Sequence, residues 1–160
     1  MKQYLVVMIA VANVFGTPVL AGSPNASPLV GSWAVDIARL PMPPEARPKS
    51  VTITFNDAGD GKWATQVEVV GPDGSKSHAE GIATLDGTAA PVKGNLEADV
   101  AAVKLPVPNV LVMMLSRAGV PASTRVYAVA VDGKSMVETA AYFEKDGSPV
   151  MRTNYFTRIR

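Results

Sequence analysis

Residues 124–159, TRVYAVAVDGKSMVETAAYFEKDGSPVMRTNYFTRI, carry the clearest indication of the fold. It contains three runs rich in apolar residues, 124–131, 135–143 and 150–159, separated by Asp132-Gly133 and Asp146-Gly147. Asp-Gly pairs suit the positive φ angles of tight hairpin turns. Each pair between two apolar runs therefore predicts two antiparallel neighbouring strands.

The same pattern occurs earlier in the chain. Residues 51–55 alternate strictly, with Val, Ile and Phe on one face and Thr on the other. Further strands are predicted over 63–70 and 76–85, each bounded by turn-forming residues. Strands at this spacing with no helices between them indicate an all-β, antiparallel up-and-down meander that closes into a barrel. Closure removes the sheet edges that would otherwise be exposed.

The middle of the chain allows two interpretations. Residues 95–105 fit a helix with Asn95 as its N-cap and Pro106 as its stop. The apolar run 110–115, however, needs an antiparallel partner, and residues 100–105 are the nearest candidate. We favour a strand from about Val100, because local helix propensity is a weak guide when tertiary pairing competes with it.

The N-terminal segment has the layout of a secretory signal peptide, with Lys2 before the apolar run 4–15 and small residues leading to cleavage after Ala21. The expected organisation is a signal peptide at 1–21, a flexible lead-in at 22–28 and one barrel domain at 29–160. The run is too short and too interrupted for a membrane span, so no stable membrane insertion is expected after cleavage. The protein is expected to be exported, either to the periplasm or outside the cell.

Composition argues against several functions. Lys+Arg 15 against Asp+Glu 14 leaves no excess of positive charge for nucleic acid. With Cys 0 and His 1, a thiolate metal site, a Cys nucleophile and any site with two imidazoles are excluded. His78, the single imidazole, lies among alternating polar residues and is interpreted as a surface residue. We expect no catalytic residues, metal or cofactor, and an enzyme is the least supported class because no nucleophile–base pair is visible.

Several short elements resemble a lipocalin-like family of small exported bacterial proteins, mostly of unknown function. The resemblance lies in Gly31-x-Trp33-x-Val35-Asp36, in Pro91-Val92-x-Gly94-Asn95 and in Asp132-Gly133-Lys134, and runs from about Leu29 to Ile159, nearly the whole expected mature chain. It implies a lipocalin-like barrel in which Trp33 plugs the closed end. It also implies that an arginine of the last strand, for which we select Arg158, packs on the indole. Both roles are structural.

The remaining candidates concern the barrel interior. Val67, Met113, Tyr127 and Tyr155 are the expected ligand-binding residues, and Met114, Tyr142 and Phe143 are further candidates for an adaptable apolar cavity. The function predicted from these residues is non-catalytic binding of a small apolar ligand. The alternative is a filled barrel that acts as an envelope structural or protein-interaction module, with 40–44 and Val120-Pro121 as exposed contact loops.

Overall fold

A computed structural model describes residues 27–160, so the expected signal peptide lies outside the described residues. The strands are β1 (Gly31–Val35), β2 (Ser50–Gly59), β3 (Lys62–Val70), β4 (Lys76–Thr84), β5 (Asp86–Gly94), β6 (Val100–Val107), β7 (Val110–Arg117), β8 (Val120–Val129), β9 (Ser135–Phe143) and β10 (Pro149–Arg158). Two short 3-10 helices, η1 (Ile37–Arg39) and η2 (Pro44–Ala46), connect β1 to β2. Neither they nor any other helix within 27–160 has the length and apolar character needed to cross a membrane.

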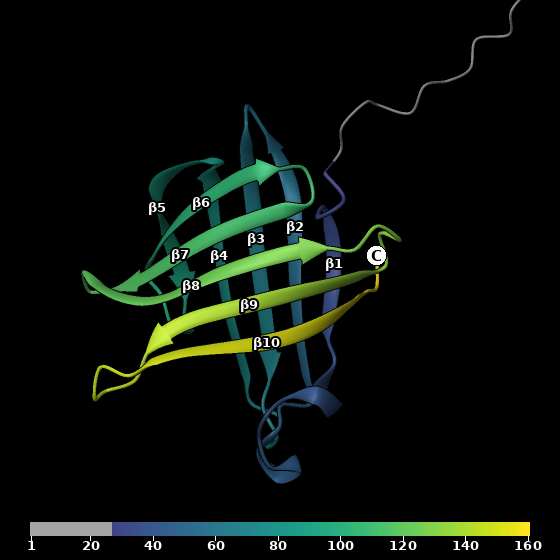
Figure 1. Ribbon diagram of the computed structural model, residues 1–160, viewed down its shortest axis with the longest axis vertical. Helices are drawn as coiled ribbons and strands as arrows, with labels where there is room; N and C mark the ends of the chain where they lie inside the picture. The colour runs from purple at the N-terminus through teal and green to yellow at the C-terminus, as the bar shows by residue number, and fades with distance from the viewer. Residues whose placement is uncertain (1–26) are drawn as a thin grey trace, which may run out of the picture.

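The strands form one closed antiparallel barrel in chain order (Figure 1). Closure depends on β1, which pairs with β2 on one side and with β10 on the other. Trp33 lies opposite Ile53 in the first pairing and opposite Arg158 in the second. The predicted all-β, up-and-down barrel is therefore confirmed.

The Asp-Gly turns form the predicted hairpins. Between β8 and β9, Gly133 has φ +65, and the Asp132 carboxylate accepts a hydrogen bond from the Lys134 backbone N–H at 2.8 Å. The Asp146 carboxylate makes the same contact with the Ser148 backbone N–H at 2.9 Å. In each turn the aspartate side chain holds the backbone two residues further on, as expected for Asx-turns.

The ambiguous middle segment is a strand from Val100 onward, as favoured. Neighbours on both sides supply its hydrogen-bonding partners: Ala101 lies opposite Ala90 of β5 and opposite Leu115 of β7. The strand β5 itself is not indicated by the sequence pattern, since Pro91 stands within it and lacks a backbone N–H. Tertiary pairing on two sides thus decides the conformation of β6 over the local helix signal.

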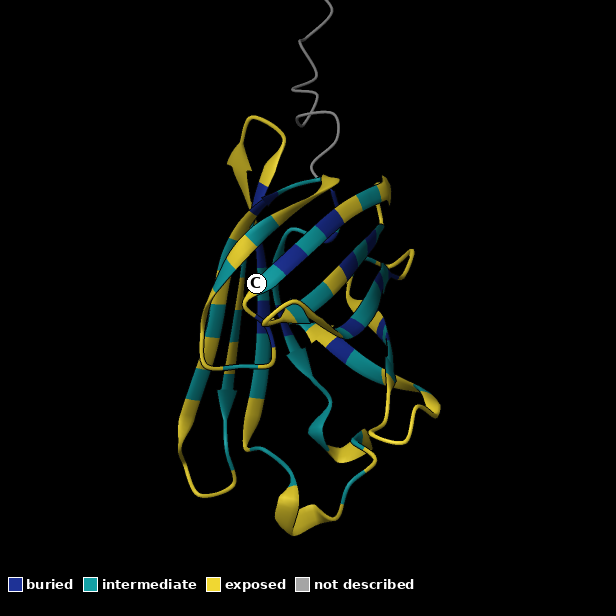
Figure 2. Cartoon of the chain, turned by 90° about the vertical axis from the view of Figure 1, so that its left-hand side faces the viewer, coloured by how far each residue is buried: buried dark blue, intermediate teal, exposed yellow. Residues whose placement is uncertain are grey.

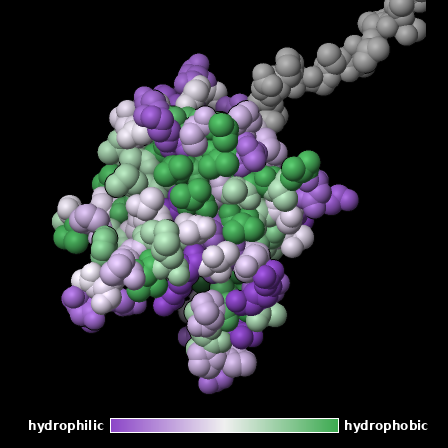
Figure 3. Space-filling view, in the orientation of Figure 1, coloured by the Kyte–Doolittle hydropathy of each residue, from purple (hydrophilic) through white to green (hydrophobic). Residues whose placement is uncertain are grey.

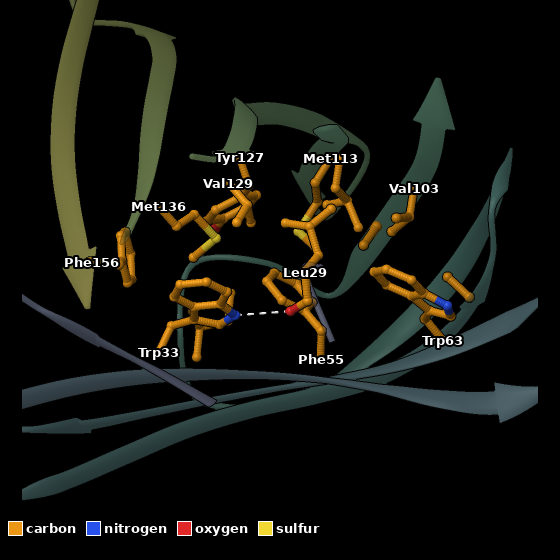
Figure 4. Packing of buried hydrophobic residues seen from close by; sticks show 14 residues of the cluster. Leu29, Trp33, Phe55, Trp63, Val103, Met113, Tyr127, Val129, Met136 and Phe156 are labelled. Carbon is orange, nitrogen blue, oxygen red and sulfur yellow. Dashed lines mark hydrogen bonds between the residues drawn. The ribbon is translucent and has the colours of Figure 1, made fainter. Parts of the chain in front are cut away.

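One end of the barrel is tightly packed and the other is a mouth. The segment 36–49, with η1 and η2, lies across the mouth at the bottom of Figure 1, and buried positions gather toward the opposite, packed end in Figure 2. The largest fully buried apolar side chains are those of Leu29, Trp33, Phe55, Leu111 and Met136. Figure 4 shows Leu29, Trp33, Phe55 and Met136 close together in one apolar cluster. Burial of each contributes about 1.5–3 kcal/mol relative to exposure.

Packing begins before Leu29. Ser27 is buried and its hydroxyl donates a hydrogen bond to the Pro108 carbonyl, while the Arg158 guanidinium donates to the Pro28 carbonyl. The last two residues of the segment expected as a flexible lead-in, 22–28, therefore contact the barrel. Residues 22–26 lie outside the described part of the chain.

The outer face of β7–β10 carries two rows of residues without charge. One row consists of Met114, Thr124, Ala141 and Met151. The neighbouring row consists of Val112, Val126, Thr139 and Thr153. Met114, Phe143 and Met151 are 59%, 73% and 74% exposed there. Hydrophobic residues gather on this face of the molecule in Figure 3.

Candidate functional site

A cavity of about 560 Å³ lies inside the barrel, between the packed end and the mouth. Its lining is mainly aliphatic and includes Ile53, Val67, Val69, Val103, Met113 and Leu115. At the mouth it reaches Leu40, Pro41 and Met42 of the connection between β1 and β2. An interior of about eight strands is just wide enough for side chains to fill, and diameter grows with strand number. The ten strands of this barrel therefore leave room for a small molecule.

Most of the expected ligand-binding residues line this cavity: Val67 of β3, Met113 of β7 and Tyr127 of β8. Tyr155, the fourth expected ligand-binding residue, does not line it. Side chains alternate along a strand, so the inward-facing Phe156 places its neighbour Tyr155 outside. There the guanidinium carbon of Arg39 lies 3.2 Å from the centre of the Tyr155 ring.

The further candidates divide in the same way. Tyr142 of β9 lines the cavity. Phe143 and Met114 lie on the outer face described above, because each follows an inward-facing residue along its strand. Their apolar character does not indicate on which side of the barrel wall they lie.

One wall of the cavity is polar, and the sequence analysis did not identify it. On β8, Arg125 donates a hydrogen bond from Nη1 to Oε1 of Glu138 at 2.6 Å, and from Nη2 to Glu97 in the 95–99 connection. On β10, Asn154 donates from Nδ2 to the other oxygen of Glu138 at 2.6 Å. The Glu138 side chain is 2% exposed and both its oxygens are occupied. A buried carboxylate is tolerated under these conditions, because it is paired and hydrogen-bonded.

Tyr127 completes this wall. Burial is the main cause that raises the pKa of the Tyr127 phenol above its ordinary value, and the negative charge of Glu138 raises it further. The phenol is therefore protonated at neutral pH and acts as a hydroxyl group. The sequence contains a signal for Arg125 and Glu138. Each lies two residues along its strand from a buried apolar or aromatic residue, Arg125 from Tyr127 and Glu138 from Met136, so each faces the same side of the barrel wall.

The remaining titratable candidate lies away from the cavity. His78 is exposed on β4, and its cross-strand neighbour on β3 is Glu68. Within residues 27–160, no group of three His, Cys, Asp or Glu side chains is placed to hold a metal ion.

Trp33 and Arg158 meet at the packed end. The indole Nε1 donates a hydrogen bond to the Leu29 carbonyl at 2.8 Å (Figure 4). The Arg158 guanidinium carbon lies 4.1 Å from the centre of the Trp33 ring. Arg158 also donates to the backbone oxygens of Val30 and Gly133, at 2.8 and 2.7 Å. This contact joins the first and last strands and lies away from the cavity.

Gly31 permits this close approach. It has φ +130, and a Cβ at this position would lie 2.5 Å from Nη1 of Arg158. A larger residue would therefore both strain the backbone and displace the guanidinium. The glycine two residues before Trp33 is therefore needed for steric reasons, because it leaves room for the Arg158 guanidinium.

Fold and cavity together define a ten-stranded antiparallel up-and-down β-barrel with a largely apolar interior and one polar wall. The chain matches no family model, and a comparison with curated proteins finds no match.

Proposed function

We propose that this protein is a non-catalytic, lipocalin-like binding protein that holds a small, mainly apolar molecule inside the barrel. The observation that carries the proposal is the cavity of about 560 Å³, with its mainly aliphatic lining. Ligand pockets typically have volumes of about 300–1,000 Å³, apolar linings and a few convergent polar groups. The cavity has each of these properties.

The arrangement of the polar wall supports binding over catalysis. Catalytic nucleophiles and bases need a partner in reach and an unoccupied side toward the substrate. Glu138 instead accepts hydrogen bonds at both oxygens, from Arg125 and Asn154. A carboxylate held in this way serves the structure of the wall.

The lipocalin-like assignment and export rest on separate observations. The Trp33–Arg158 contact beside Gly31 supports the first, because it has the form implied by the family resemblance. The signal-peptide pattern of residues 1–21 supports the second. The alternative, a filled interaction module, has less support, because its interior would be packed and Leu40–Met42 line the cavity.

Dye binding to matched variants tests the proposal. The probe is N-phenyl-1-naphthylamine, a neutral lipophilic dye whose fluorescence rises in apolar surroundings. Ala101→Phe extends a side chain into the cavity, whereas Ala102→Phe places the same ring on the opposite side of β6. We expect Ala101→Phe to weaken dye binding at least about tenfold and Ala102→Phe to leave it unchanged.

Native mass spectrometry of protein purified from its own cells, without detergent, provides a second measurement. A co-purifying small molecule of defined mass would support the proposal. A bare polypeptide that also fails to bind the dye would overturn it. Equal weakening of dye binding by the two phenylalanine variants would place the dye outside the barrel and overturn it as well.

A further inference from the structure

The polar wall contains two arginines in one row of the sheet. Cross-strand register places Arg125 of β8 opposite Ala140 of β9, and Ala140 opposite Arg152 of β10. All three residues line the cavity. The small Ala140 side chain between the two arginines leaves the space above it to their guanidinium groups.

Arg125 is fully engaged within the protein. Its Nη1 and Nη2 donate to Glu138 and Glu97, and its Nε donates to the Ser123 hydroxyl at 3.3 Å. Both carboxylates of the wall are thus already paired with one guanidinium. A cationic ligand would have to compete with Arg125 for them.

Arg152 is differently placed. Among residues 27–160 no carboxylate lies within ion-pair distance of it, and its guanidinium donates no hydrogen bond. The guanidinium carbon lies 5.4 Å from the centre of the Tyr142 ring, which also lines the cavity. Arginine remains protonated in proteins and presents a planar fork of donors that fits carboxylate and phosphate groups. Arg152 therefore offers the cavity a positive charge without a carboxylate partner in this part of the chain.

The position of Arg152 sets a direction for a ligand. Arg152 is exposed near the mouth, whereas Met113 and Phe156 line the cavity toward the packed end. We infer, resting on the binding function proposed above, that the ligand is an amphipathic organic anion. Its acidic group pairs with Arg152 beside Tyr142, and its apolar part lies in the deeper cavity. An acidic group without this partner would lose hydration on entry, which disfavours binding.

Ligands with one alkyl chain and different head groups test this inference. Dodecanoate, dodecyl phosphate, 1-dodecanol and dodecylamine are added below their micellar concentrations, and displacement of N-phenyl-1-naphthylamine is measured. We expect one or both acids to bind at least about tenfold more tightly than 1-dodecanol, since hydrogen bonds to charged groups are the stronger ones. The comparison of carboxylate with phosphate identifies which acid the site prefers.

Variants assign the preference to one side chain. Arg152→Gln should remove most of the advantage of the acids and leave 1-dodecanol unchanged, and Arg152→Lys should retain part of it. Lys145→Gln is the matched control, since it removes one positive charge from the exposed turn between β9 and β10. It should leave all four affinities unchanged, and circular dichroism should give the same fold for each variant.

These measurements distinguish failure of this inference from failure of the proposed binding function. If the dye and 1-dodecanol bind but the acids bind no more tightly, the inference is overturned and the binding function stands. The same conclusion follows if dodecylamine binds most tightly, or if Arg152→Gln weakens every ligand equally. If neither the dye nor any alkyl ligand binds, the proposed function fails, and this inference fails with it.

Discussion

Trp33→Ala is the substitution that tests most directly how the packed end holds the barrel together. The indole is fully buried, donates a hydrogen bond to the Leu29 carbonyl and lies under the Arg158 guanidinium. Truncation of a buried aromatic side chain to alanine costs about 3–5 kcal/mol, because transfer energy is lost and a cavity remains. The guanidinium–indole contact accounts for about 0.5–2 kcal/mol of the stabilisation.

Urea unfolding provides the assay. Trp63 is the other tryptophan of the chain, so its fluorescence reports unfolding of the variant. The free energy of unfolding should fall by about 3–5 kcal/mol, and its slope against urea concentration (the m-value) should not change. The melting temperature should fall by about 10–20 °C. Phe143→Ala is the control, since that ring is 73% exposed and its removal should change stability by less than about 0.5 kcal/mol.

The reasoning is refuted if Trp33→Ala lowers the free energy of unfolding by less than about 1.5 kcal/mol, or by no more than Phe143→Ala does. The barrel would then be held by its strand pairing without dependence on the buried indole. A smaller m-value would instead indicate that the packed end is already partly exposed to solvent in the folded variant.

Three further predictions concern other parts of the barrel. Glu138→Ala should lower the free energy of unfolding by about 3 kcal/mol, because it removes the buried partner of Arg125. Glu97→Ala removes the more exposed partner of the same guanidinium and should lower the free energy of unfolding by less than about 1 kcal/mol. Equal losses in urea unfolding would show that burial does not distinguish the two pairs. Hydrogen bonds, first from a backbone N–H two residues further on and then from a neighbouring threonine hydroxyl, lower the pKa of Asp86 from 3.8 to about 2. Because the folded pKa is the lower one, the stabilising contribution of Asp86 is complete above about pH 4 and is lost as the pH falls through about 2. Asp86→Asn should therefore flatten the decline of the melting temperature between those values, and a parallel decline would contradict the assignment. Gly31→Ala should destabilise the barrel, since a Cβ there would lie 2.5 Å from the Arg160 carbonyl oxygen and the backbone has φ +130. A melting temperature unchanged from the parent would refute this.

Local turn chemistry made most of the fold predictable. The side chains of Asp132 and Asp146 accept hydrogen bonds from backbone N–H groups two residues further along the chain. The hairpins that join β8, β9 and β10 can therefore be predicted from a few neighbouring residues. The strand β5 was not predictable in this way. Its pairing with β4 and β6 overrides the poor strand propensity of Pro91, and such pairing is a property of the assembled sheet.

Strand parity explains which site residues were found. Val67, Met113 and Tyr127 were assigned to the interior from apolar character, whereas Tyr155 was assigned there despite an inward-facing neighbour, Phe156. The polar wall was missed for the opposite reason, since arginine and glutamate within a strand normally indicate the solvent side. Their contact depends on the pairing of β8 with β9, which places Arg125 opposite Ala140, two residues along β9 from Glu138.

The pairing of β1 with β10 sets the order of events during synthesis. The first strand of the barrel has its second partner at the other end of the chain, and Trp33 receives its covering guanidinium only when Arg158 has left the ribosome. A nascent chain in which β10 has not yet been synthesised can form hairpins but no closed barrel. Long-range pairing of this kind slows folding, because loop-closure entropy is lost before the contact forms. The barrel can therefore close only once β10 is available to pair with β1, and this strand determines when the interior becomes separated from water.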